Sequence, residues 1–142
     1  MAITQAMCSS FKQELLVGTH NFTNSSGNTF KLALFTSSAS LGAATTAYSS
    51  SNEASGTNYS AGGNTLVNQT PTLDSTTAIT DFSDSSWSSS TITARGGLIY
   101  NSSASNKAVA VLDFGSDKSS SNGTFSVIFP APAASTAIIR IA

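Results

Sequence analysis

The chain has 142 residues, enough for one domain with a buried core, and its six basic and seven acidic residues give a net charge of −1. This weak, scattered charge excludes the basic patch of a nucleic-acid-binding protein, and no run approaches the roughly 20 apolar residues of a membrane span. The single cysteine, Cys8, excludes an intrachain disulfide. With no secretory signal visible, we expect a protein made in the reducing cytoplasm.

Hydroxyl residues dominate the composition, because 28 Ser and 18 Thr make up about a third of the chain. Disorder is not the expectation, since the net charge is low and the chain has eight Phe, three Tyr and one Trp. Hydroxyl side chains, Thr above all, are well suited to strands. The composition therefore predicts a folded, neutral, all-β domain.

The only helical signal lies in residues 3–17, where Ile3, Met7, Phe11 and Leu15 recur every four residues. Ser10 with Gln13 would instead cap a shorter helix from Phe11. We expect a helical arm within residues 1–20. It either docks on a partner through Phe11 and Leu15 or packs on the sheet of its own chain.

Residues 29–36 alternate as a strand, and a polar stretch follows over residues 37–63. We expect a long surface loop there, or a short helix near 43–48, or an edge strand near Tyr59. Tyr48 and Tyr59 are its expected anchors. Further strands are predicted at 65–73, where Pro71 indicates an edge, at 76–82 and at 137–141. Residues 83–90 read as a serine-rich turn interrupted by Trp87.

The strongest pattern lies in residues 91–129, where three apolar runs, 91–100, 107–114 and 124–129, are separated by polar loops. This arrangement predicts a β-meander with the middle run as a central strand buried on both faces. Gly96 and Gly97 in mid-strand indicate a bulge or a close backbone contact. With the other runs, seven strands and one N-terminal helix predict a single-domain β-sandwich, jelly-roll-like or immunoglobulin-like, over residues 1–142.

The predicted core combines alternate residues of these runs. We expect one buried cluster formed by Phe30, Leu32, Leu34, Val109, Val111, Phe125 and Val127.

Catalytic chemistry is poorly represented in the sequence. His20 is the only histidine, and no G-x-S-x-G elbow surrounds any serine, so we interpret it as a loop histidine. Cys8 has no cationic neighbour in sequence and reads as a structural thiol. The pairs Asp81/Asp84 and Asp113/Asp117 could help bind calcium, but neither matches an EF-hand loop. We expect no enzyme, no cofactor and no metal.

Arg95 is a candidate partner for a carboxylate, within the domain or across an interface. Trp87, Tyr48, Tyr59 and Tyr100 are possible stacking platforms if the chain is a carbohydrate-binding or receptor-binding module. The candidate interface residues are thus Phe11, Leu15, Tyr48, Tyr59, Trp87 and Arg95.

Four segments together resemble small virion proteins of tailed bacteriophages. They are SFKQELLVGTHNF, TFKLALFTSSASLGAATTAYS, ITARGGLIYN and KAVAVLDFGSDKSSSNGTFSVIFP. The resemblance covers most of the chain and is strongest over residues 91–130, where such proteins often read T-x-T-A-R-x-x-x-I-Y, D-F-G and N-G-T-F. It supplies no catalytic motif.

The resemblance implies a virion structural protein, first of all a capsid decoration (cement) protein that binds the assembled shell. A neck, tail or fibre component, or a carbohydrate-binding or receptor-binding module of the virion, is the alternative. The expected partners are the major capsid protein or other virion proteins. We also expect a homo-oligomer, a dimer or a trimer.

Overall fold

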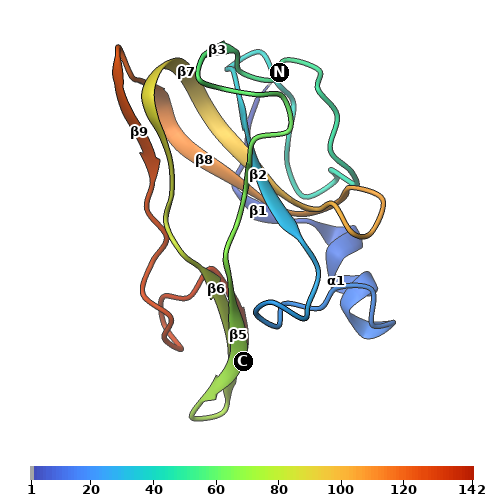
Figure 1. Cartoon of the computed structure of the whole chain (residues 1–142). Helices are drawn as coiled ribbons and strands as arrows, with labels where there is room; N and C mark the ends of the chain where they lie inside the picture. The colour runs from blue at the N-terminus through green and yellow to red at the C-terminus, as the bar shows by residue number, and fades with distance from the viewer. Residues whose placement is uncertain (1) are drawn as a thin grey trace.

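The computed structural model describes residues 2–142, so Met1 of the predicted helical arm lies outside it. The chain is 48% strand and 6% helical, and its antiparallel sheets confirm the predicted all-β sandwich with one N-terminal helix (Figure 1). Its elements in chain order are β1 (Ala6–Met7), α1 (Ser9–Leu16), β2 (Phe30–Phe35), β3 (Gly56–Thr57), β4 (Asn64–Thr65), β5 (Asn68–Asp74), β6 (Thr77–Phe82), β7 (Ser85–Asn101), β8 (Lys107–Ser119), β9 (Gly123–Val127) and β10 (Ile139–Ile141).

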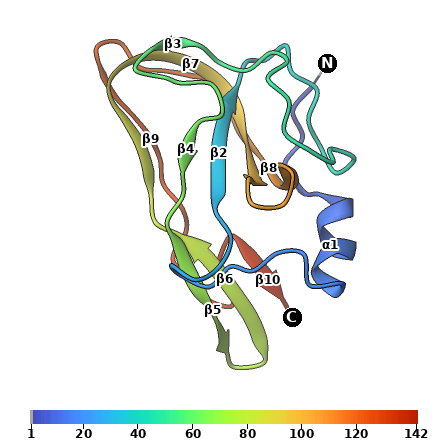
Figure 2. The same ribbon diagram turned by 45° about the vertical axis from the view of Figure 1, so that its right-hand side comes forward.

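The larger sheet has the order β1-β8-β7-β2-β4, and β3 and β9 also join it through β7. The smaller sheet has the order β10-β6-β5 and lies at the end opposite the turn of β7 (Figures 1 and 2). β5 is an edge strand, as Pro71 predicted, and the pairing of β5 with β6 slips in register between Gln69 and Thr72.

β7 organises the sandwich because its 17 residues pair with four other strands. Its C-terminal half pairs with β2 and β8, and its N-terminal half pairs with β9 in the register Ser85↔Val127. The predicted meander is therefore wrong, since β9 adds to β7 and not to β8. The physical reason is the length of β7. Because β7 begins as early as Ser85, it is long enough for β8 and β9 to pair with it one after the other along the same strand.

β7 turns over at the top of the molecule, so its two halves lie in different layers (Figure 1). In the N-terminal half of β7 the pairing with β9 slips between Trp87 and Ser90, and Ser89 there has a φ of +49°. The segment predicted as a serine-rich turn is mostly strand. Serine is compatible with a strand that has one face exposed to solvent. On the other face, Ser85, Trp87 and Ser90 point inward.

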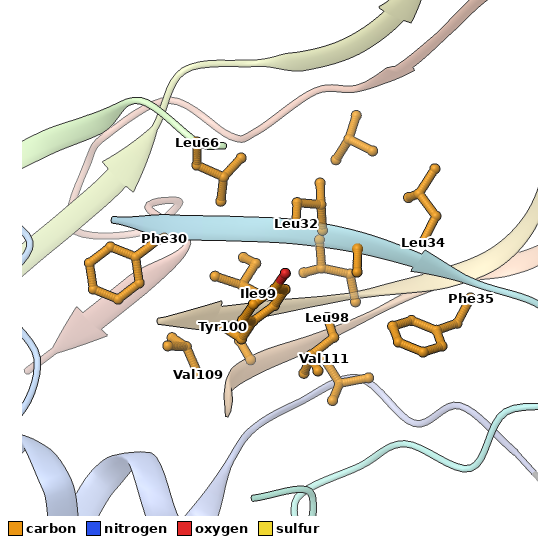
Figure 3. Packing of buried hydrophobic residues seen from close by; sticks show 14 of the residues in the cluster. Phe30, Leu32, Leu34, Phe35, Leu66, Leu98, Ile99, Tyr100, Val109 and Val111 are labelled. Atoms are coloured by element: carbon orange, nitrogen blue, oxygen red, sulfur yellow. The ribbon is translucent and has the colours of Figure 1, made fainter. Parts of the chain in front are cut away.

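The core lies between these layers and confirms the predicted cluster. Figure 3 shows side chains of β2, β7 and β8 packed around β2. All seven predicted core residues are at most 8% exposed and belong to one cluster. The middle run is buried on both faces from Ala108 to Leu112, as predicted for a central strand.

The two mid-strand glycines allow close packing. A Cβ on Gly96 would clash with the carbonyl oxygen of Leu112, and one on Gly97 would lie 2.9 Å from Cδ1 of Leu32. The pairing of β7 with β8 also slips between Ala94 and Gly96. Both features that the glycine pair predicted, a bulge and a close contact, are confirmed.

The helix is shorter than the predicted 3–17, because residues before Ser9 are extended. Ile3 pairs with Leu41, and Met7 pairs with Ala110 of β8. Cys8 is the N-cap without a side-chain capping bond, so the predicted Ser10 cap is wrong too. The apolar side chains that recur every four residues, such as Ile3 and Phe11, are buried on the sheet. An extended segment followed by a short helix buries them as well as one long helix would.

Candidate functional site

The long loop over residues 37–63 is fixed by a cluster of three tyrosines around one carboxylate. Glu53 Oε2 accepts a hydrogen bond from the Tyr48 hydroxyl at 2.6 Å, and Oε1 accepts from the Tyr59 hydroxyl at 2.6 Å. The Gly62 N–H donates to the same Oε1 at 2.7 Å, and the Tyr100 hydroxyl donates to the Gly62 carbonyl at 2.7 Å. Tyr48 and Tyr59 are thus anchors, as predicted.

The phenols of this cluster are held neutral by their surroundings. Burial raises the pKa of Tyr59 above its ordinary value, and its hydrogen bond to Glu53 adds to the effect. Burial also raises the pKa of Tyr100 to about 12, with the charge of Glu53 contributing. No helix forms near 43–48. The alternative edge strand near Tyr59 is confirmed as β3, which pairs with Thr91 and Ile92.

A second polar network surrounds His20, whose side chain is fully buried. His20 Nε2 lies 2.9 Å from Glu14 Oε1, and Lys107 Nζ lies 3.5 Å from Glu14 Oε2. Asn101 Nδ2 lies 3.0 Å from His20 Nδ1, which makes Nδ1 the acceptor and Nε2 the N–H donor in this arrangement. Both ring nitrogens are occupied by a carboxylate and an amide, so the network ties α1 to the sheet.

The two acidic pairs are not part of larger clusters of ionisable side chains in the described chain. Within residues 2–142, no group of three or more His, Cys, Asp or Glu side chains could hold a metal ion. Asp113 is engaged by Arg95, whose Nη2 lies 3.2 Å from Asp113 Oδ1, so Arg95 finds its carboxylate within the domain. Asp84 accepts the N–H of Phe129 at 2.8 Å.

Asp81 is the least satisfied of the acidic groups. It is fully buried, and although Oδ1 accepts the N–H of Phe82, Oδ2 has no hydrogen-bond partner among the described residues. Burial raises the pKa of the Asp81 carboxyl, and the charge of Asp84 adds to the increase. The hydrogen bond from the backbone N–H of Phe82 to Oδ1 opposes it.

The predicted interface residues are scattered, and two of the six, Phe11 and Trp87, are buried. Phe11 is fully buried and Trp87 is 5% exposed, so the helix packs on its own sheet and the indole lies in the core. Tyr100 is 2% exposed, and the hydroxyls of Tyr48 and Tyr59 are bonded to Glu53. Of the four aromatic residues considered as stacking platforms, Trp87 and Tyr100 are thus buried, whereas Tyr48 and Tyr59 are half-buried.

Exposed apolar side chains instead gather at the end where α1, β5 and β10 meet. We define the terminal patch as Leu16, Val17, Leu73 and Ile141, which are 89%, 71%, 74% and 57% exposed. A groove of about 420 Å³ lies between the end of α1 and the smaller sheet; of the patch, Ile141 lines it, together with Leu15 and Pro71 among others. Figure 2 shows α1 and β10 at this end, close to the C-terminus.

Sequence reasoning identifies only one neighbour of this patch, Leu15, which is half-buried at its rim. The sequence pattern places Leu16 in the inward stripe of a longer helix, and Leu73 and Ile141 in strands with a buried face. The sequence feature that could have indicated the patch is the run of three apolar residues from Leu15 to Val17 at the helix end. Adjacent residues on a helix cannot all face one sheet, so at least one of them must be exposed.

Comparison with known protein families, with curated proteins and with solved structures finds no match to this chain. No helix in the described part of the chain is long and apolar enough to cross a membrane.

Proposed function

We propose that this protein is a structural component of a bacteriophage virion, a capsid decoration protein that binds the assembled shell. The terminal patch is the observation that carries the proposal. Soluble domains rarely leave several large apolar side chains together on the surface unless another protein covers them. The resemblance of residues 91–130 to small virion proteins supports the same assignment.

The polar clusters support a binding role over a catalytic one. Glu53, His20 and Arg95 each bond to partners within the chain. The ring of His20 is sealed from solvent. An active site needs at least one such group to face a substrate, whereas a structural module needs rigid support behind an apolar contact surface.

In this proposal the terminal patch is the shell-binding surface. This revises the contact region expected from sequence, because Phe11 is buried in the core of its own chain. Binding rests on apolar burial and shape, with many identical copies amplifying a modest affinity at each site. It therefore changes little between low and moderate salt, unlike a contact driven by charge.

The test mixes purified protein with shells that lack it and measures co-sedimentation, followed by electron cryomicroscopy. Leu16→Lys and Leu73→Lys should weaken binding by about tenfold or more each, since every 1.4 kcal/mol is tenfold. Val67→Lys is the matched control, because Val67 is 56% exposed but lies outside the patch, and it should bind normally.

Failure of the wild-type protein to co-sediment, with density for it only at the neck, tail or fibres, would reject the decoration role and favour the alternative virion positions. Binding that is lost equally in all three variants would reject the terminal patch as the contact surface.

A further inference from the structure

Within residues 2–142, the free edge of β9 is the one strand edge of substantial length that the fold leaves unprotected. β9 pairs with β7 alone, and in Figure 1 it forms the left-hand margin of the molecule. An unpaired strand edge presents a row of N–H and C=O groups that can accept a further strand.

The register identifies which backbone groups face outward. Phe129 donates its N–H to the side chain of Asp84, the residue before β7, and Gly123 accepts a hydrogen bond at its carbonyl from the Ser90 side chain. Odd-numbered residues of this segment thus turn their backbone polar groups towards β7. Alternation along an antiparallel strand then directs those of Thr124, Ser126 and Ile128 away from it.

Other edges of the sheets carry protective features that β9 lacks. β5 contains Pro71 and a register slip, and β10 is only three residues long with Arg140 at its centre. On β8, the N–H of Asp113 is bonded to Gln5 Oε1, and the N–H of Gly115 is bonded to Asp113 Oδ1. Between residues 119 and 139 the sequence has neither a charge nor, before Pro130, a proline.

We propose that the free edge of β9 pairs with the same edge of a second copy of this chain, antiparallel and about a two-fold axis centred on Ser126. An antiparallel pair is the only arrangement in which identical edges meet with two-fold symmetry. In this register Ser126 lies opposite Ser126 of the second copy, and Thr124 lies opposite Ile128.

A second copy suits this edge better than a charged peptide would. Because residues 119–139 carry no charge, the paired segments themselves bring no like charges together. Ile128 is 71% exposed, and the pairing brings its side chain over Thr124 of the other copy. The layer formed by β9 and the N-terminal half of β7 would continue across the axis as one sheet. The pairing is independent of the terminal patch, so it stands or falls separately from shell binding.

The first test is analytical ultracentrifugation of the full chain over concentrations up to about 1 mM, which detects even weak association. The wild-type protein should form dimers. Ile128→Lys should be monomeric, because two lysines would face the contact, and Ser126→Pro should be monomeric because it removes an outward N–H. Leu73→Lys is the matched control, with an equally exposed apolar residue on β5, and should dimerise like the wild type.

Amide hydrogen exchange provides a second, residue-level readout that does not depend on a variant folding. In dilute protein the amides of Thr124, Ser126 and Ile128 should exchange quickly, while those of Phe125 and Val127 are protected by β7. At high concentration the three even-numbered amides should become protected. A wild-type protein that stays monomeric throughout, or a dimer in which these three amides remain unprotected, would overturn the proposal.

Discussion

The ring of Tyr48 stacks on the ring of Tyr100, with centroids 4.6 Å apart and planes 14° from parallel. Tyr48 belongs to the long loop and Tyr100 to β7, so this contact joins an irregular segment to the centre of the larger sheet. Together with the hydrogen bonds to Glu53, this contact explains how the 27 residues of the loop 37–63, which have few large apolar side chains, keep a defined conformation.

Tyrosine ionisation should be coupled to unfolding in alkali. The pKa of Tyr100 is raised from 10.0 to about 12, and those of Tyr48 and Tyr59 are raised as well. The unfolded chain therefore loses phenolic protons first, so stability falls as pH rises from about 10 towards 12. Near-ultraviolet absorbance of tyrosinate should appear together with the loss of β-sheet circular dichroism. Tyrosinate in a fully folded protein near pH 10 would contradict this.

Replacing Asp81 by Asn should stabilise the protein at neutral pH. Burial raises the pKa of Asp81, so the folded state binds its proton more tightly than the unfolded state does. Below the pKa of this carboxyl in the unfolded chain, about 3.9, the protonated side chain contributes its full stability. That contribution is lost as the pH rises through the higher pKa of the carboxyl in the folded protein. Asp81→Asn should thus raise Tm at pH 7 and make no difference in strong acid, whereas Asp117→Asn, on an exposed stretch, should change neither. A lower Tm at pH 7 would show that Oδ2 is engaged.

Substitutions at two glycines can distinguish the cost of backbone strain from the cost of a steric clash. Gly63 and Gly115 both have positive φ, at +75° and +82°, but only Gly63 faces other atoms, since a Cβ at this position would clash with the carbonyl oxygen of Leu32. Gly115→Ala should cost about 1–2 kcal/mol for the left-handed conformation alone. Gly63→Ala should lower the free energy of unfolding by clearly more in urea titrations. If both substitutions lower the free energy of unfolding by the same amount, β2 can shift to accommodate the new methyl group at no cost.

Truncating Phe125 tests whether β9 closes the core. Phe125 is 6% exposed and lies near Trp87, with ring centroids 6.1 Å apart, so Phe125→Ala should cost about 3–5 kcal/mol. Ile128→Ala, three positions along and 71% exposed, should change stability by no more than about 0.5 kcal/mol. An unchanged Tm for Phe125→Ala would show that this face is not part of the core.

The alternation of apolar residues is sufficient to predict which faces are buried. Phe125, Val127 and Phe129 point inward while Ser126 and Ile128 point outward, because a strand has only two faces. Pairing partners cannot be predicted in the same way. Nothing local to β9 distinguishes β7 from β8 as its neighbour, since that choice depends on β7 continuing through Trp87.

The candidate site is harder to predict than the fold. The prediction of Tyr48 and Tyr59 as anchors is correct, because aromatic residues in a small-residue loop must pack somewhere. The prediction of Trp87 at the surface is wrong, since its serine neighbours suggest a turn where the chain is strand. The terminal patch joins residues from three elements that are far apart in sequence, and they border the groove between the end of α1 and the smaller sheet only once the chain has folded.

The route of β8 and β9 along β7 has a consequence for how the chain folds. Asn101 and Lys107 are joined by a short connection, so their pairing closes a small loop at low entropic cost. Each pair formed brings the next within reach, and the ladder can extend from this turn outward to Ser85 and Val127. Pairing of Phe30 with Asn101, by contrast, must close a loop of about seventy residues. We therefore expect the turn at 101–107 to be structured in the folding transition state, and β2 and α1 to dock on a ladder that has already formed.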